Sequence, residues 1–371
     1  MVDKKLVAGT FTLMGTMIGA GILALPYAFS KAGFLAGLFW LIILGIIMLF
    51  VHLYLGEVIL RTNGFHQLTG YAEKYLGNAG KKLMIFAMIF GVYSALIAYL
   101  IGEGQSFSFL FFGSEKYVLA FGILFWFCMT LFLRGGMKGL KKVASWGVFA
   151  VVCIIIGLFV WFAPQIETSN LYKFNTNLFF LPFGIVLFAL LGFTSIPEVG
   201  KIMQYSKKNL KMALILGSII PIIIYLLFTL TFVGVLGENI KEVATLSLQK
   251  PIAFLGIFTM LTAYFVLSFS LKDMLAIDLR MRKKKVFILV SVTPLVLFLL
   301  ISYFKFLDFG SVLSLGGIVS GAITGILILL MNYRAKKWSE REPEYWMPLN
   351  WLIILIFSLI FILGGIFEFF F

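Results

Sequence analysis

Two short stretches, each with glycine and proline inside an apolar segment, decide the fold. The first reads Gly15-Thr-Met-Ile-Gly-Ala-Gly-Ile-Leu-Ala-Leu-Pro26 and the second Phe188-Ala-Leu-Leu-Gly-Phe-Thr-Ser-Ile-Pro-Glu198. Glycine costs a helix about 1 kcal/mol relative to alanine, and proline costs about 3 kcal/mol. Both stretches therefore predict a helix that unwinds part-way along its length. The first stretch alone slightly favours close helix packing through Gly15 and Gly19, but the matching break in the second favours a binding site.

The composition around these stretches is that of a membrane protein. Of the 371 residues, 61% are hydrophobic and only 12% are charged, whereas soluble domains have about 45–50% apolar and about 25% charged residues. A surface with so little charge must face lipid. The same figures exclude a disordered chain, a coiled coil and a disulfide scaffold, and we predict an all-α integral membrane protein.

Eleven stretches are long and apolar enough to cross a bilayer as helices. The expected spans are 6–30, 34–60, 82–109, 117–134, 142–163, 178–199, 211–236, 252–275, 286–304, 308–332 and 349–370. The connections between them are short and polar. Residues 1–371 therefore form a single transmembrane domain with no room for a separate soluble one.

The basic residues predict the orientation. The formal net charge is +14 from 30 Lys and Arg residues. With the N-terminus inside, 24 of these residues fall in the inner segments and 6 in the outer segments, which is a strong positive-inside signal. Basic clusters therefore fix topology and do not indicate a nucleic acid partner. We expect a multi-pass protein of the cell membrane with a cytoplasmic N-terminus and the C-terminus at the outer face.

The first ten spans divide into two similar sets of five. Gly21 and Pro26 in helix 1 match Gly192 and Pro197 in helix 6, each pair being separated by four residues, and the two motifs are 171 residues apart. The starts of later helices are offset by about 170 residues as well. An odd number of spans per repeat inverts the second copy, as in many secondary transporters. We expect repeats at 6–163 and 178–332, discontinuous helices 1 and 6, and an extra helix at 349–370.

At these residues the chain resembles the amino acid-polyamine-organocation superfamily and, within it, the amino acid/auxin permease group. The helix 1 stretch is especially similar to the bacterial hydroxy and aromatic amino acid permeases, and the helix 6 stretch matches more loosely. The resemblance implies a secondary active amino acid transporter that works by alternating access as an ion-coupled symporter, with no cofactor. A transporter of another small zwitterion or amine on the same fold is the alternative.

The resemblance also implies a substrate site at the two breaks. The substrate carboxylate would bind the backbone amides of Gly19, Ala20 and Gly21, where a positive helix end favours an anion. Relatives often have serine at the position of Ala20, so carboxylate binding here rests on the backbone alone or on Thr16. The substrate ammonium would meet carbonyls freed at the breaks.

The residues that match those carbonyls are Met17, Phe188 and Leu191. Gly192 and Thr194 flank the second break. Phe188 and Phe193 are the aromatic residues expected near the substrate.

The coupling ion is either H⁺ or Na⁺. For sodium, hydroxyls on helix 8 are candidates, namely Ser268 and Ser270, although Gly15 stands where sodium-coupled members have asparagine. For a proton, the intramembrane candidates are His52, Glu57 and Glu103.

Each proton candidate also has a structural interpretation. Glu57 lies four residues before Arg61 and is expected to form an ion pair with it. Glu103 is expected near the outer interface, where it faces water. His52, like most lone helix histidines, is expected to be satisfied by a neighbour.

Two rival classes of function fit less well. A membrane-embedded enzyme needs a cluster of His, Asp, Glu or Cys near one interface, and 2 His, 2 Cys and 16 scattered acidic residues supply none that we recognise. A channel needs a ring of pore residues, which nothing in the sequence indicates.

Overall fold

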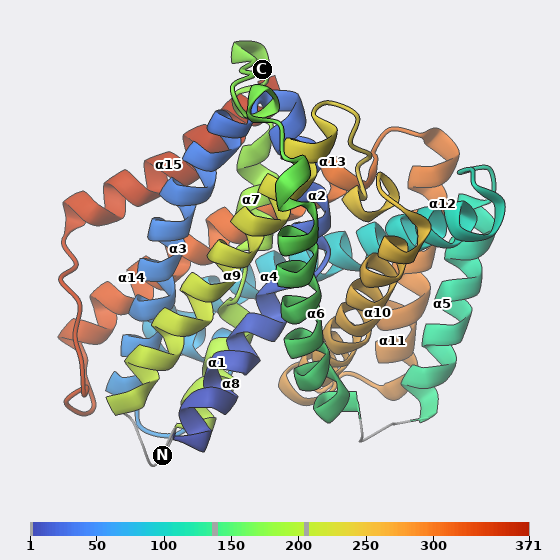
Figure 1. The fold of residues 1–371 in the computed structure, drawn as a ribbon. Coiled ribbons are helices and arrows are strands. Elements are labelled where there is room, and N and C mark those ends of the chain that lie inside the picture. The colour runs from blue at the N-terminus through green and yellow to red at the C-terminus, as the bar shows by residue number, and fades with distance from the viewer. Residues whose placement is uncertain (1–2, 136–139, 204–207, 371) are drawn as a thin grey trace.

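The computed structural model describes residues 3–135, 140–203 and 208–370, and in these ranges the protein is helical and has no strand (Figure 1). The α-helices are α1 (Lys4–Met17), α2 (Ala20–Ala32), α3 (Phe34–Arg61), α4 (Leu68–Phe112), α5 (Val118–Gly135), α6 (Leu140–Phe162), α7 (Pro182–Ala189), α8 (Ile196–Ile202), α9 (Lys208–Leu236), α10 (Lys250–Asp273), α11 (Lys283–Phe287), α12 (Thr293–Phe304), α13 (Phe309–Gly316), α14 (Ala322–Lys337) and α15 (Trp351–Phe370). Single π-helical turns follow α10, α11 and α13, the last at Gly317–Gly321.

The all-helical class predicted from the sequence is confirmed in the described residues. Nine helical segments there are long and apolar enough to cross a membrane, or ten if the bent pair α1 and α2 is one span. A shorter apolar helix covers Val118–Arg134. The count of eleven spans is thus approached but not reproduced, and it stays a prediction.

Helix 1 is broken where the glycines predict. α1 ends at Met17, α2 begins at Ala20, and the two helices are bent by 54°. Gly19 has φ −138° and ψ −142°, which no helix contains. Pro26 lies inside α2, so the glycines produce the break and the proline does not.

Helix 6 is broken at the matching place. α7 ends at Ala189, and the chain resumes as a 3₁₀ turn at Phe193–Ser195 followed by α8. The second predicted break is therefore also present.

The third span begins earlier than its predicted start at residue 82. α4 begins at Leu68 and continues through a kink at Gly77, whose φ of 74° is a conformation that glycine adopts without strain. Charged residues in this segment, such as Glu73 and Lys74, hide the helix from an argument based on apolar runs.

Loops assigned to one side of the membrane contact each other. In the inner set, Glu340 accepts from Lys74 at 2.6 Å and from the Asn63 amide at 2.7 Å. In the outer set, Lys173 pairs with Glu238 and Lys241 with Glu115, at 3.0 and 3.1 Å. The described ends of the chain lie at opposite ends of the bundle (Figure 1). Lys138 and Lys207, counted on the inner side, lie outside the described residues.

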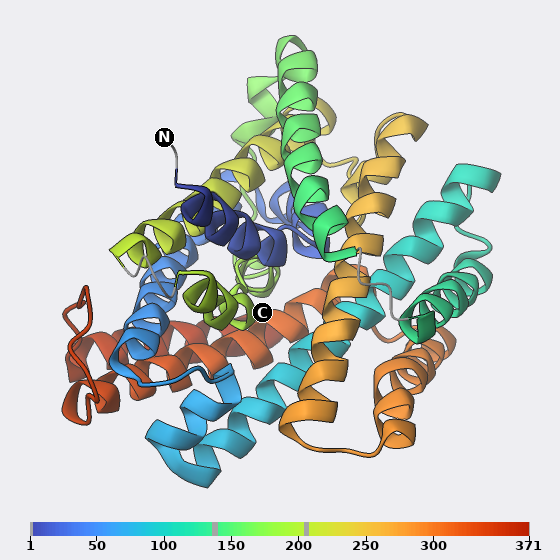
Figure 2. The same ribbon diagram turned by 90° about the horizontal axis from the view of Figure 1, so that it is seen from below.

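Seen from below, the broken helices occupy the middle of the bundle (Figure 2). α5 lies with the α11–α12 segment at one edge, and α15 lies at the opposite edge, packed on α14 and α7.

The buried carboxylate of Glu57 joins α3, α14 and the 338–350 loop. Glu57 of α3 forms the predicted ion pair with Arg61 at 2.8 Å and also accepts from the Asn332 amide of α14 and the Met347 backbone, each at 3.1 Å. Its side chain is fully buried. Glu57 therefore fixes the 338–350 loop to both helices.

We expect Glu57→Leu to destabilise the protein by about 3 kcal/mol, because removing one partner of a buried ion pair leaves the other charge uncompensated. Thermal unfolding in detergent measures the change. The matched control is Glu73→Leu, because Glu73 is 52% exposed and pairs with Lys81 at the surface, where such pairs contribute at most about 1 kcal/mol. Equal midpoints for the two variants would contradict the role given to Glu57.

Candidate functional site

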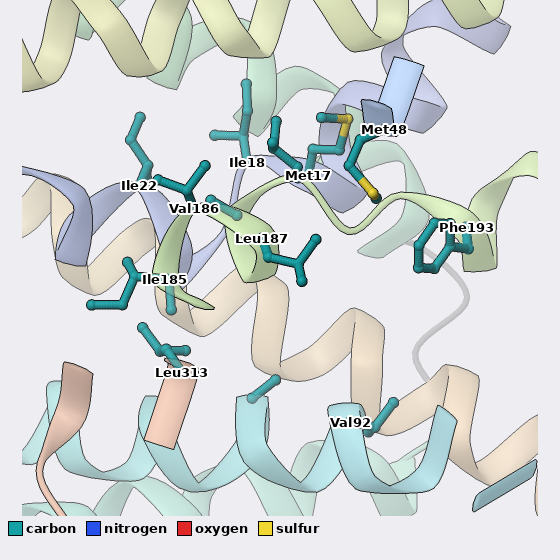
Figure 3. Packing of buried hydrophobic residues seen from close by; sticks show 14 of the residues in the cluster. Met17, Ile18, Ile22, Met48, Val92, Ile185, Val186, Leu187, Phe193 and Leu313 are labelled. Atoms are coloured by element: carbon teal, nitrogen blue, oxygen red, sulfur yellow. The ribbon is translucent and has the colours of Figure 1, made fainter. Parts of the chain in front are cut away.

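The two helix breaks lie against each other. A Cβ atom built on Gly21 would lie 2.6 Å from the Cα atom of Ala189, so α2 and α7 approach at backbone distance. Figure 3 shows Met17 and Ile18 beside Val186 and Leu187, with Val92 of α4 opposite them. The structure thus brings together the two stretches that the sequence singles out.

A tyrosine hydroxyl connects the two breaks. The Oη atom of Tyr225, on α9, lies 2.6 Å from the carbonyl oxygen of Met17 and 2.9 Å from that of Ala189. The hydroxyl has one proton, which it donates to one of these carbonyls at a time. Because freed backbone groups inside a membrane must find partners, Tyr225 stabilises both breaks.

A cavity opens between the breaks and the helices α4, α10 and α14. Its lining residues are Thr16, Met17, Gly19, Gly21, Leu68, Met88, Gly91, Val92, Ala95, Tyr99, Phe188, Leu191, Phe193, Thr194, Leu267, Ser320 and Thr324. None of these described residues has an ionisable acid or base except the phenol of Tyr99. A bound charge must therefore be matched by backbone dipoles and hydroxyls.

One end of the cavity suits an anion. α2 begins at Ala20 after Gly19, and no side chain caps its first amides. The hydroxyl of Tyr99 lies beside this helix start, 2.9 Å from a Cβ atom built on Gly19. The Thr16 hydroxyl is already engaged, because it donates to the Thr12 carbonyl at 3.1 Å. The groups that an anion needs are therefore presented by the start of α2 and by Tyr99.

The same region offers negative dipole ends for a cation. α1 ends at Met17 and α7 ends at Ala189, so the carbonyl ends of both helices meet here. Two of the expected carbonyls are partly occupied: that of Met17 by Tyr225, and that of Phe188 by the Leu191 amide at 3.1 Å. The Gly192 carbonyl is capped by the Ser195 amide and hydroxyl.

Most residues predicted for the substrate site line this cavity. Those that do are Thr16, Met17, Gly19, Gly21, Phe188, Leu191, Phe193 and Thr194. Ala20 and Gly192 are buried and lie outside the lining; a Cβ on Gly192 would meet Leu13, His52 and Met17.

Sequence reasoning missed Tyr99 and Tyr225, which contact the breaks from other helices. The signal that could have found Tyr99 is a polar aromatic residue deep inside an apolar span.

The proton candidates lie near the site in different ways. His52 is fully buried, its Nδ1 atom lies 2.9 Å from Ser218 Oγ, and its ring packs edge-on against Phe193. Its Nε2 atom has no hydrogen-bond partner in the described residues.

The expectation that Glu103 faces water is wrong. Its side chain is 0% exposed and neither carboxyl oxygen has a hydrogen-bond partner in the described part of the chain. The reason is that α4 continues outward to Phe112 and buries this position against neighbouring helices. Glu103 lies one helical turn after Tyr99, on nearly the same face of α4.

The serine candidates on α10, Ser268 and Ser270, do not line the cavity at the helix breaks or the second cavity described below. Ser268 is buried with an unpaired hydroxyl, and Ser270 is exposed. A second, smaller cavity lies between α1, α6 and α10, where Gly15 and Ile18 face Thr259 and Thr262. These threonines, which the sequence did not single out, are the α10 hydroxyl residues beside the helix 1 break.

The 237–249 loop packs against α10 and α13. Thr245 packs on Gly256 of α10, and Glu242 accepts the Phe309 amide at 3.0 Å. Burial, together with the neighbouring Asp308 carboxylate, raises the pKa of Glu242 to about 8. The cavity extends to Leu68, which is the first residue of α4 and lies at the end of this helix opposite to Phe112.

The chain is similar in sequence to two known transporters. The chain is 29% identical over 260 residues to the tyrosine-specific transport system 1 of Haemophilus influenzae, covering 66% of this chain and 62% of the relative. It is 24% identical over 241 residues to the glutamine transporter 2 of Aliivibrio fischeri, covering 63% of this chain and 62% of the relative. The chain thus matches less than two thirds of either relative's length.

The fold has a counterpart among solved structures. The crystal structure of MhsT in complex with L-phenylalanine superposes with a TM-score of 0.68 at 16% sequence identity, covering 100% of this chain and 98% of MhsT. The two proteins therefore share their fold.

The family model for tryptophan/tyrosine permeases matches residues 2–367, which is nearly the whole chain. Together with the many apolar helices, this match identifies a multi-pass membrane protein that belongs to the tryptophan/tyrosine permease family.

Proposed function

We propose that this protein is a secondary active transporter that moves amino acids across the cell membrane by alternating access. One observation carries the proposal: two broken helices meet at a cavity that presents amide and carbonyl ends and, among the described residues that line it, no carboxylate or ammonium side chain. A zwitterion finds both of its charges matched there without an ionised side chain.

Aromatic amino acids are the substrates that the cavity fits best. Phe188, Phe193 and Met88 supply apolar surface, and the family description and the Haemophilus relative both point to aromatic substrates. A diamine would favour an acidic lining. No carboxylate occurs among the described lining residues, which argues against the amine alternative.

Alternating access would use the predicted inverted repeat. In this proposal the halves 6–163 and 178–332 rock about the two breaks, with eleven spans, a cytoplasmic N-terminus and the C-terminus at the outer face. The packing of the 237–249 loop on α13 and the extension of the cavity toward Leu68 support an inward-directed arrangement.

We expect Gly21→Ala to abolish uptake of labelled L-tyrosine by proteoliposomes. The added methyl group would lie 2.6 Å from the Ala189 Cα atom, so the two breaks would have to separate. Size-exclusion chromatography before reconstitution verifies that the variant is folded.

The matched control is Gly157→Ala, because a Cβ atom on Gly157 in α6 meets no heavy atom within 4 Å. This variant retains uptake. Uptake by the Gly21 variant at the wild-type rate would place the site elsewhere, and no uptake of any amino acid by the wild-type protein under any ion gradient would refute the proposed function.

For coupling, we propose the proton as the ion and Glu103 as its carrier. A buried carboxyl group without a counter-charge is far more stable neutral than ionised. Within the described ranges, neither carboxyl oxygen of Glu103 has a hydrogen-bond partner, and the residue follows Tyr99 by one helical turn. Release of its proton would require water to reach this face of α4, which ties protonation to the conformation of the site.

We expect Glu103→Gln to lose uptake driven by a pH gradient while it keeps exchange of internal for external L-tyrosine. Glutamine keeps the size and neutrality of the protonated acid but cannot release a proton. Gradient-driven uptake and exchange are measured in the same proteoliposomes.

If a sodium gradient drives uptake and a pH gradient does not, proton coupling is wrong. The sodium candidates are then the second cavity, beside Thr259 and Thr262, and the predicted residue Ser268. Loss of both exchange and gradient-driven uptake in Glu103→Gln, with wild-type protein active, would contradict the role of Glu103 as a carrier.

A further inference from the structure

Thr324 is a buried hydroxyl residue without a partner in the wall of the cavity. Its side chain is 1% exposed, and its Oγ1 atom has no hydrogen-bond partner in the described residues. Burying an unpaired hydroxyl is unfavourable, because the group loses its hydrogen bonds to water. A ligand that supplies the missing hydrogen bond would recover this cost.

Three other helical threonines near the helix 1 break satisfy their own hydroxyl groups. Thr16, Thr259 and Thr262 each donate to the carbonyl four residues earlier. The residue four positions before Thr324 is Ser320, in the π-helical turn Gly317–Gly321. Such turns are frequent at functional sites, and Thr324 does not form the usual bond here.

Close packing fixes the position of Thr324 relative to the helix 6 break. A Cβ atom on Gly317 would lie 2.1 Å from the Gly184 carbonyl oxygen, and one on Gly321 would lie 3.1 Å from Leu191. This part of the chain therefore lies directly on α7. Thr324 is held in the cavity wall close to the level of Leu191.

The lining of the cavity has two polar positions along α4, and it continues past the second one to Met88 and Leu68. Tyr99 lies at the helix 1 break, and Gly91 packs on Ser320, whose Oγ atom would lie 2.4 Å from a Cβ on Gly91. Tyr99 and Gly91 are eight positions apart, which corresponds to about 12 Å along the helix. Val92 and Ala95 line the interval, so an apolar stretch separates the charge-matching end from the hydroxyls of Ser320 and Thr324.

We infer that Thr324, with Ser320 beside it, is the specificity-determining group for the far end of the substrate side chain. It selects amino acids whose side chain has an apolar body and a hydrogen-bonding tip, such as a phenol, over hydrocarbon side chains of similar size. This inference rests on the proposed function, because it assumes that the backbone of an amino acid occupies the two breaks.

The test compares binding of L-tyrosine and L-phenylalanine to purified wild-type protein, Thr324→Val and Thr324→Ser. Valine keeps the shape and removes the hydroxyl. We expect wild-type protein to prefer tyrosine, and Thr324→Val to bind tyrosine about tenfold more weakly, or about 1.4 kcal/mol, with phenylalanine affinity changed less than twofold. Thr324→Ser restores the preference.

Thr229→Val is the matched control, because the Thr229 hydroxyl of α9 is also buried and unpartnered but does not line the cavity. This variant keeps the wild-type ratio of affinities. The inference is overturned if Thr324→Val changes both affinities equally or neither, or if wild-type protein binds both ligands equally well. If wild-type protein binds and transports no amino acid, the proposed function itself fails and this inference fails with it.

Discussion

The contact between the two helix breaks is the constraint on which the rest of the structure depends. Inside a bilayer an unwound segment is tolerated only where its amides and carbonyls find partners. Here Gly21 lets the backbone of α2 touch Ala189, and Tyr225 supplies a hydroxyl to the carbonyls exposed on both sides. The helices must therefore be arranged so that α9 reaches the point where the break in helix 1 meets the break in helix 6.

This arrangement places polar groups that could match a charged molecule inside a very hydrophobic chain. The polarity of the site comes from helix ends and hydroxyl groups, which carry no net charge and so avoid the large cost of burying an ion. Ionisable residues such as Glu57 instead hold the 338–350 loop to the neighbouring helices. Binding and scaffolding therefore use different kinds of polar group.

The sequence predicted the features that depend on backbone preference. Glycines at 15, 19 and 21 and the motif at 192–197 located both breaks, because the helical cost of glycine and proline is a local property. Tyr99, Tyr225 and Thr324 were not predicted, since their roles arise from helices distant in sequence. The burial of Glu103 and the early start of α4 were also missed, because hydropathy alone does not reveal which neighbours cover a residue.

Glu242, in the loop between α9 and α10, lies close to Asp308 at the start of α13, and this proximity affects how the protein responds to pH. Burial and the nearby carboxylates of Asp308 and Glu115 raise the pKa of Glu242 from 4.5 to about 8, although the hydrogen bond from the Phe309 amide favours the ionised form. The net stability of this loop contact therefore falls as the pH rises from about 4.5 toward about 8. Release of this loop from α13 therefore becomes easier as the pH rises. A transport rate that varies with pH would therefore report on this loop contact as well as on the proposed coupling ion. Counting the ions moved per substrate molecule separates the two effects, which a pH profile alone does not.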